Sequence, residues 1–161
     1  MKKLTTLSLA AAAAFAVLPA FGQVKMKYQP DPVFGQDRIK KLHDASPAKA
    51  AVAPAKPRKM LIFSRTSGFR HYGGIVAAKE VLKHMGEKLG VWETVISDDV
   101  NEFTPENLKK YDVVILNNPT AACFGPTNVE LDQMSKEDAK KAVQNSLQYC
   151  KNLIEYVKNG G

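Results

Sequence analysis

The sequence predicts an α/β domain in which a parallel sheet carries helices on both faces, and we expect the chain to hold only the first part of that domain. Three short apolar runs, at residues 59–64, 91–96 and 112–116, have the length and composition of buried strands. Segments with helical periodicity, at 75–89 and 135–158, follow the first and third runs. Strands that alternate with helices favour right-handed crossovers and a parallel sheet.

The first 22 residues have the layout of a secretory signal peptide. Lys2 and Lys3 precede an apolar run over residues 4–18, and the small residues Ala20 and Gly22 indicate cleavage near Gly22. The run is shorter than the roughly 18 to 20 residues that span a bilayer, so a retained N-terminal anchor is the less favoured alternative. We therefore expect a periplasmic or secreted protein whose mature chain has no transmembrane segment.

Residues 23–58 are rich in Pro, Ala and Lys and predict a linker. Such a segment buries too little apolar surface to offset its ordering entropy, so we expect a tether with at most a short helix over 36–42. The net charge of +7 lies ahead of the globular part, because residues 60–161 hold 12 basic and 13 acidic side chains. This balance gives no support to nucleic-acid binding.

The globular domain is expected over residues 59–161, and its first unit is a strand, a loop and a helix. The apolar strand at 59–64 is followed by a polar, glycine-containing loop at 65–74. Apolar residues then recur at helical spacing up to Leu89, and Gly90 provides a C-terminal stop.

The second unit begins with a strand at 91–96 that leads to an acidic pair, Asp98 and Asp99. Thr104 and Pro105 then have the features of an N-cap and of a first helical residue. We therefore expect a short helix directly after this loop.

The third strand, at 112–116, ends in Asn117 and Asn118. Further along, Ser135 stands three residues before an acid, which is typical of a helix start, and apolar positions then mark a long helix to about residue 158. The chain stops at two glycines, where the next element of such a fold is a buried strand. We therefore expect it to be truncated.

Residues 60–71, 103–118 and 156–161 resemble ThuA-like (trehalose utilisation) domains, and the resemblance covers roughly 59–161. Its most specific parts are the Gly-Phe-Arg-His turn at 68–71 and the Tyr-Asp-Val-Val-Ile run at 111–115. The resemblance implies a flavodoxin-like fold similar to class I glutamine amidotransferases. It also implies a role in the metabolism of sugars, including oxidised disaccharides.

The resemblance implies that a further strand with a characteristic histidine follows the terminal glycines. In amidotransferases the nucleophilic cysteine lies on an elbow between a strand and a helix later in the fold. We expect Cys150 inside a helix and Cys123 in a loop, so the nucleophile role is assigned to neither. Whether these two cysteines pair as a disulfide is left open by the sequence.

Arg70 and His71 are the candidate catalytic residues. They follow the first strand, and ligands of parallel α/β domains bind at the carboxyl ends of the strands. A histidine can act as acid, base or metal ligand near neutral pH, and an arginine can bind carboxylate or sugar oxygens with two parallel hydrogen bonds. The structural alternative is that His71 caps the next helix and Arg70 is a solvated loop charge.

Four further candidates for substrate binding also lie in loops after strands: Ser67, Asp98, Asn117 and Asn118. Their amides, hydroxyl and carboxylate suit sugar hydroxyls, although an acid after a strand is also a common turn residue. The first loop has a weak likeness to the phosphate loop of flavodoxins, but the bulky and charged residues after it do not suit such a loop. The spacing of the histidines predicts no metal site, and the sequence identifies no cofactor.

The leading hypothesis is an exported ThuA-like protein that acts on or binds a small-molecule carbohydrate derivative of the trehalose or keto-sugar type. One alternative is a non-catalytic sugar-binding or interaction module, and another is a relative of hydrolases or amidotransferases. Whether the chain is an enzyme is left open. A sheet of three strands has an edge with unpaired backbone groups, so we also expect self-association.

Overall fold

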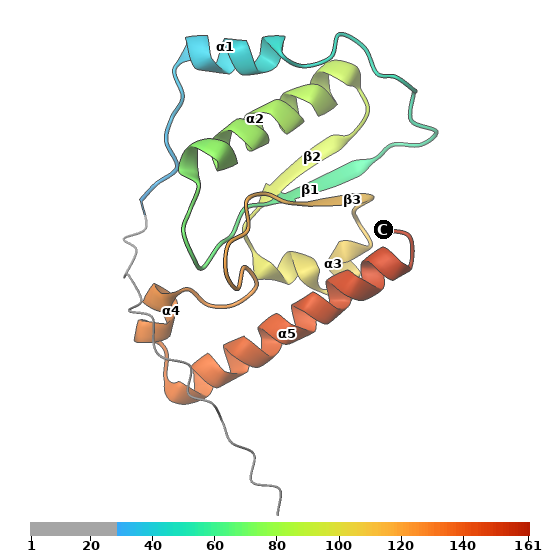
Figure 1. Cartoon of the computed structure of the whole chain (residues 1–161). Coiled ribbons are helices and arrows are strands. Elements are labelled where there is room, and N and C mark those ends of the chain that lie inside the picture. Colours follow the sequence, from blue (N-terminus) through green and yellow to red (C-terminus); the bar gives the residue numbers. More distant parts are fainter. Residues whose placement is uncertain (1–28) are drawn as a thin grey trace, which may run out of the picture.

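A computed structural model describes residues 29–161, and the expected signal peptide at 1–22 lies outside the described residues. Figure 1 shows three layers: α1 (Gln36–Asp44) and α2 (Tyr72–Leu89) on one face of a sheet, and α3 (Pro105–Leu108) and α5 (Lys136–Lys158) on the other. The predicted α/β class with helices on both faces is confirmed.

The sheet consists of β1 (Lys59–Phe63), β2 (Glu93–Ser97) and β3 (Val113–Leu116) in the order β2-β1-β3, with all strands parallel. Leu61 of the central strand lies opposite Val95 on one side and Val114 on the other. A central strand is covered on both faces, which explains why β1 reads as an uninterrupted apolar run. The three predicted strands are correct to within two residues at each end.

The main hydrophobic core lies between the sheet and the α3–α5 layer. Phe63 contacts Phe103 edge-on, with ring centroids 4.7 Å apart, and Phe124 closes the aromatic group at 4.4 Å from Phe103. Aromatic pairs of this kind add about 0.5 to 1.5 kcal/mol to the free energy gained by burying their area. The core therefore fastens the loop that follows β3 to the strand that precedes the first site loop.

The residues predicted from the sequence to start or end helices do so in the structure. The hydroxyl of Thr104 accepts a hydrogen bond from the Asn107 amide at 3.3 Å, and that of Ser135 accepts one from the Asp138 amide at 3.1 Å. Gly90 ends α2 with a φ of 63°, a left-handed conformation that favours glycine.

Two elements were not expected: a 3-10 helix, η1 (Val100–Phe103), and α4 (Asn128–Gln133). The Thr127 and Glu130 side chains form a capping box at the start of α4, because each accepts from the backbone amide of the other residue. A Thr followed three residues later by Glu is a sequence signal for this motif, so α4 could have been predicted from the spacing.

Composition predicted a free tether over 23–58, but the structure places part of this segment on the domain. The short helix that we expected over 36–42 is present as α1 and packs on α2, and Phe34 is buried beneath the Arg38 guanidinium. The imidazoles of His43 and His84 stack with their centroids 3.8 Å apart. Since His43 belongs to α1 and His84 to α2, this contact joins the two helices.

Candidate functional site

The loops after the three strands meet at one edge of the sheet, beside the start of α2 and close to α4 (Figure 1). Hydrogen bonds of threonine side chains connect the loops after β1 and β3. Thr66 donates to the Thr120 carbonyl at 2.7 Å, and the Thr120 hydroxyl donates to the Phe69 carbonyl at 2.6 Å. The loops after β1 and β3 therefore form one connected wall.

Asn117, a predicted substrate ligand, is enclosed in this wall and is only 4% exposed. Its amide nitrogen donates to the Ser64 hydroxyl and to the Ile75 carbonyl, both at 3.1 Å. These bonds join the ends of β3 and β1 to the first turn of α2. The structure therefore places Asn117 as a support of the loops, whereas the sequence predicted a residue that faces the ligand.

Arg70, a predicted catalytic residue, is also buried, at 5% exposure. Its guanidinium donates to the Asp31 carboxylate through Nε at 2.9 Å and Nη2 at 2.8 Å, and Nη1 donates to the Ser64 carbonyl at 2.9 Å. A buried guanidinium must satisfy its donors, and a bidentate carboxylate does so efficiently. Arg70 thus holds the segment before α1 against the end of β1.

Asp31 receives a second cation, because Lys79 of α2 lies 3.2 Å from its carboxylate. Partial burial raises the pKa of Asp31, but the hydrogen bonds from Arg70 and Lys79 outweigh this effect and hold the pKa below its ordinary value of 3.8. Asp31 was absent from the sequence candidates because no local pattern links it to an arginine that lies 39 positions later.

Asp98, a predicted substrate ligand, lies at the end of β2 with 42% of its side chain exposed. One carboxylate oxygen accepts from the Ser64 amide at 2.8 Å, and the other lies 3.9 Å from Arg70 Nη2. Its position is therefore fixed by the supporting network while part of its carboxylate faces solvent.

Asp98 lines a cavity of about 270 Å³ together with Arg65, Thr127, Val129 and Glu130. The Arg65 guanidinium donates to Glu130 at 2.7 Å, and its Nε is buried without a hydrogen-bond partner in the described part of the chain. Although burial raises the pKa of Glu130, the Thr127 amide and hydroxyl and the Arg65 charge lower it below 4.5. Carboxylates and a guanidinium therefore share one cavity at the carboxyl edge.

The remaining predicted residues form an exposed rim. His71 flanks the start of α2 without a side-chain capping bond, and its ring meets the edge of Phe69 at a centroid distance of 4.8 Å. Asn118 has a left-handed backbone, with a φ of 54°, and donates to the Asn117 side chain at 2.7 Å. Ser67 is half-buried in the same loop as Phe69. Of the six predicted residues, the cavity includes Asp98 alone.

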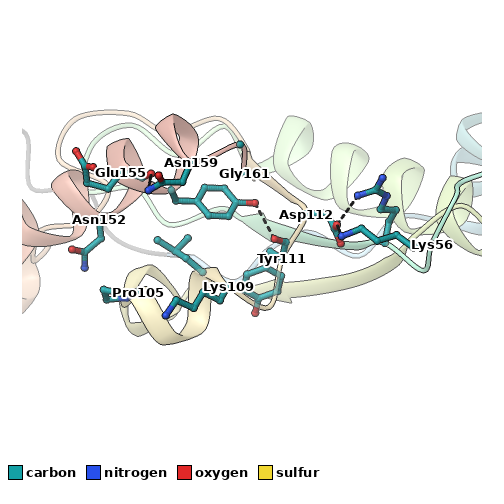
Figure 2. A pocket seen from close by; sticks show the side chains of 13 residues that line it. Lys56, Pro105, Lys109, Tyr111, Asp112, Asn152, Glu155, Asn159 and Gly161 are labelled. Atoms are coloured by element: carbon teal, nitrogen blue, oxygen red, sulfur yellow. Dashed lines mark hydrogen bonds and ion pairs between the residues drawn. The ribbon is translucent and has the colours of Figure 1, made fainter.

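A second cavity, of about 540 Å³, lies at the opposite, amino edge of the sheet. Figure 2 shows Asn152 of α5 and Asn159, which follows that helix, on one side of it, and Pro105 of α3 and Lys109, which follows α3, on the other. Its charged centre is Asp112, whose pKa is lowered strongly, most of all by the hydrogen bond from Arg58 at 2.8 Å. We place the candidate site at the carboxyl edge, because that is where ligands of parallel α/β domains bind.

Within residues 29–161, no cluster of three His, Cys, Asp or Glu side chains could hold a metal ion. In the same region, no helix is long and apolar enough to cross a membrane. The two cysteines are half-buried free thiols, Cys123 in the β3–α4 loop and Cys150 within α5, as expected. Burial raises the pKa of the Cys123 thiol, which is the opposite of what a nucleophile needs.

Comparison of the chain with protein-family models, with curated proteins and with solved structures found no match in any of the three. The fold defines the class of protein as a parallel α/β domain, and the polar cavity at the carboxyl edge of its sheet is the candidate site.

Proposed function

We propose that this chain is a ThuA-like domain that binds a small carbohydrate derivative, of the trehalose or keto-sugar type, at the carboxyl edge of its sheet. The observation that carries the proposal is the cavity of about 270 Å³ that combines Asp98, Glu130 and the Arg65 guanidinium. Carboxylates accept from sugar hydroxyls and a guanidinium donates to them. The volume falls just below the roughly 300 to 1,000 Å³ of drug-sized sites, which suits a single sugar ring, and a disaccharide of the trehalose type would place one of its two rings in the cavity.

The exposed residues at the same edge of the sheet support a chemical step as well as binding. His71 is exposed and its ring is not used to cap α2, so its nitrogens are available to a ligand. A histidine in such a position can transfer protons near neutral pH. Asn118 offers amide groups beside it, and Phe69 offers an apolar surface.

A non-catalytic sugar-binding module is the second candidate function, and one observation favours it. The ring neighbour of His71 is Phe69, and the His71 side chain forms no hydrogen bond or ion pair in residues 29–161. A general base is usually oriented by a third group. The amidotransferase alternative receives less support, because the Cys123 pKa is raised and Cys150 lies within a helix.

The binding proposal is tested by calorimetric titration of the chain from Gln23 onward with mono- and disaccharides and their keto forms. Asp98→Asn keeps the oxygen that accepts from the Ser64 amide and removes the charge from the cavity. Loss of a charged hydrogen bond costs about 1.5 to 3 kcal/mol, so we expect binding to weaken roughly tenfold to a hundredfold. Asp99→Asn is the matched control, since Asp99 caps η1 outside the cavity. Equal affinities of the two variants would contradict the proposal.

A second experiment separates catalysis from binding. His71→Gln keeps a polar side chain of similar reach but removes the ability to exchange protons. For an enzyme we expect this variant to retain sugar binding and to lose conversion of the sugar, followed by chromatography. Absence of conversion by the unaltered chain with every bound sugar would favour the binding module.

We also propose export, on the basis of the apolar run at 4–18 and the small residues that follow it. The N-terminus of the protein recovered from the periplasm or medium of an expressing bacterium should then begin near Gln23. Recovery of the chain only in the cytoplasm, with Met1 intact, would contradict export.

The edge of the sheet supports the proposal that the chain self-associates. Val113 and Leu116 of the edge strand β3 are 41% and 37% exposed, and a cavity of about 310 Å³ separates β3 from α5. Exposed strand edges and apolar patches favour pairing with another chain. Light scattering should show oligomers that decrease when Leu116→Lys places a charge on the edge. A chain that is monomeric at all concentrations would refute this.

A further inference from the structure

The two cysteines lie on separate elements that pack against the same core. Cys123 belongs to the loop between β3 and α4, and Cys150 is in the middle of α5. Both half-buried side chains contact one hydrophobic cluster, which consists of Leu61, Phe63, Phe103, Leu108, Tyr111 and Phe124. Phe124 is the neighbour of Cys123 in sequence, so the core draws this part of the loop inward.

Two further observations place the thiols near each other. The loop turns tightly at Cys123, with the Gly125 amide donating to the Ala122 carbonyl at 2.9 Å, and a Cβ on Gly125 would lie 3.9 Å from that of Ser146. Ser146 is one helical turn before Cys150 and on the same side of α5. In addition, burial and then the charge of Cys150 raise the pKa of the Cys123 thiol, which is consistent with this placement.

We propose that Cys123 and Cys150 form an intramolecular disulfide that fastens the β3–α4 loop to α5. The oxidant is a small disulfide such as oxidised glutathione. One cysteine thiolate displaces a glutathione thiolate to form a mixed disulfide, and the second cysteine thiolate then displaces the other glutathione. The protein loses two electrons and two protons, and the oxidant leaves as two thiols.

Through this disulfide, the redox state of the protein determines how firmly the loop beside the carboxyl-edge cavity is held. The fastened loop continues directly into Thr127 and then Glu130, which line the cavity with Asp98. The inference itself does not depend on sugar binding, because it concerns the loop and α5 alone. A reduced chain holds the loop on the core by side-chain packing alone, and an oxidised chain holds it by a covalent bond as well.

The experiment uses the full 161-residue chain, purified with reductant and then equilibrated with glutathione at a series of oxidised-to-reduced ratios. Thiol alkylation and intact mass measurement should show a monomer that loses both reactive thiols together, and a proteolytic digest should contain a peptide pair linked through Cys123 and Cys150. Cys123→Ser and Cys150→Ser are matched controls, which should yield only glutathione adducts.

Closing a loop of about 27 residues should raise the melting temperature of the oxidised chain by roughly 10 to 20 °C over the reduced chain. Each single-serine variant should melt at the same temperature under both conditions. Three outcomes would overturn the proposal: two glutathione adducts on an unlinked monomer, a disulfide between two chains, or a linked monomer with no gain in melting temperature.

Discussion

Replacing Asp31 by alanine tests whether the segment before α1 belongs to the folded domain. Asp31→Ala removes the carboxylate that binds two nitrogens of Arg70, whose side chain is only 6% exposed. Breaking a buried ion pair costs about 3 to 5 kcal/mol, because one charge stays buried without its partner. Asp31 is 29% exposed and Arg70 keeps its bond to the Ser64 carbonyl, so we expect a smaller loss of about 2 kcal/mol.

Urea denaturation at neutral pH, followed by circular dichroism, measures this loss. Asp37→Ala is the matched control, since Asp37 lies in the first turn of α1 and interacts chiefly with the helix dipole. Its removal should cost about 0.3 to 1 kcal/mol. If the two variants lose the same stability, Asp31 does not fasten the segment and the residues before α1 are a tether after all.

The pH dependence gives an independent check on the same ion pair. Since the folded pKa of Asp31 is depressed below 3.8, its stabilising effect is fully present above that value and is lost as the pH falls through the folded pKa. The difference in unfolding free energy between the unaltered chain and Asp31→Ala should therefore stay constant near neutrality and shrink below about pH 4. A difference that persists unchanged at pH 2 would show that the loss arises from packing instead of charge.

Three further substitutions, each followed by urea denaturation, test other parts of the fold. Gly86→Ala should destabilise the fold by roughly 2 kcal/mol despite the better helix propensity of alanine, because the added Cβ would lie 2.7 Å from the Trp92 carbonyl oxygen. Gly73→Ala is the control and should not destabilise the fold, because its added Cβ would make only an ordinary contact. Asn117→Ala should cost roughly 2 kcal/mol, since it removes the amide that donates to two buried acceptors, and a loss below 1 kcal/mol would contradict the supporting role. Glu130→Gln keeps the capping box but removes the charge that pairs with Arg65, and for this part-exposed ion pair the loss of unfolding free energy should be only about 0.5 kcal/mol. Because the Glu130 pKa is lowered, the difference in unfolding free energy between the variant and the unaltered chain should vanish as the pH falls below 4.5.

The strands and most helices were predictable because their signals are local. The apolar run of β1 reflects burial on both faces, and Thr104 and Ser135 announce helix starts through hydroxyls that cap the next turn. α1 could be predicted only as a short helix in a tether. Its packing depends on distant partners, such as the stacking of His43 on His84, which its own composition does not encode.

The position of the candidate residues at the carboxyl edge was predictable, but which of them are buried was not. Strand ends must converge in a parallel sheet, so His71, Asp98 and Asn118 could be placed at this edge from their sequence positions alone. Whether a polar residue at that edge is buried depends on what covers it. Arg70 is covered by Asp31, which belongs to a segment that the composition assigned to a linker. Arg65 forms its ion pair only because α4 places Glu130 next to it.

The buried residues of this edge also hold two of the exposed candidate residues in position. Ser64, Arg70 and Asn117 are buried, and their hydrogen bonds are directed at backbone groups, at one another and, for Arg70, at the Asp31 carboxylate. Such networks are rigid because breaking any member leaves an unpaired polar group. The backbone that carries Asp98 and Asn118 is attached to this network, through the Ser64 amide in one case and the Asn117 side chain in the other. For a ligand that binds at this edge, as proposed, side chains already fixed in position reduce the part of the binding free energy that is lost in ordering them.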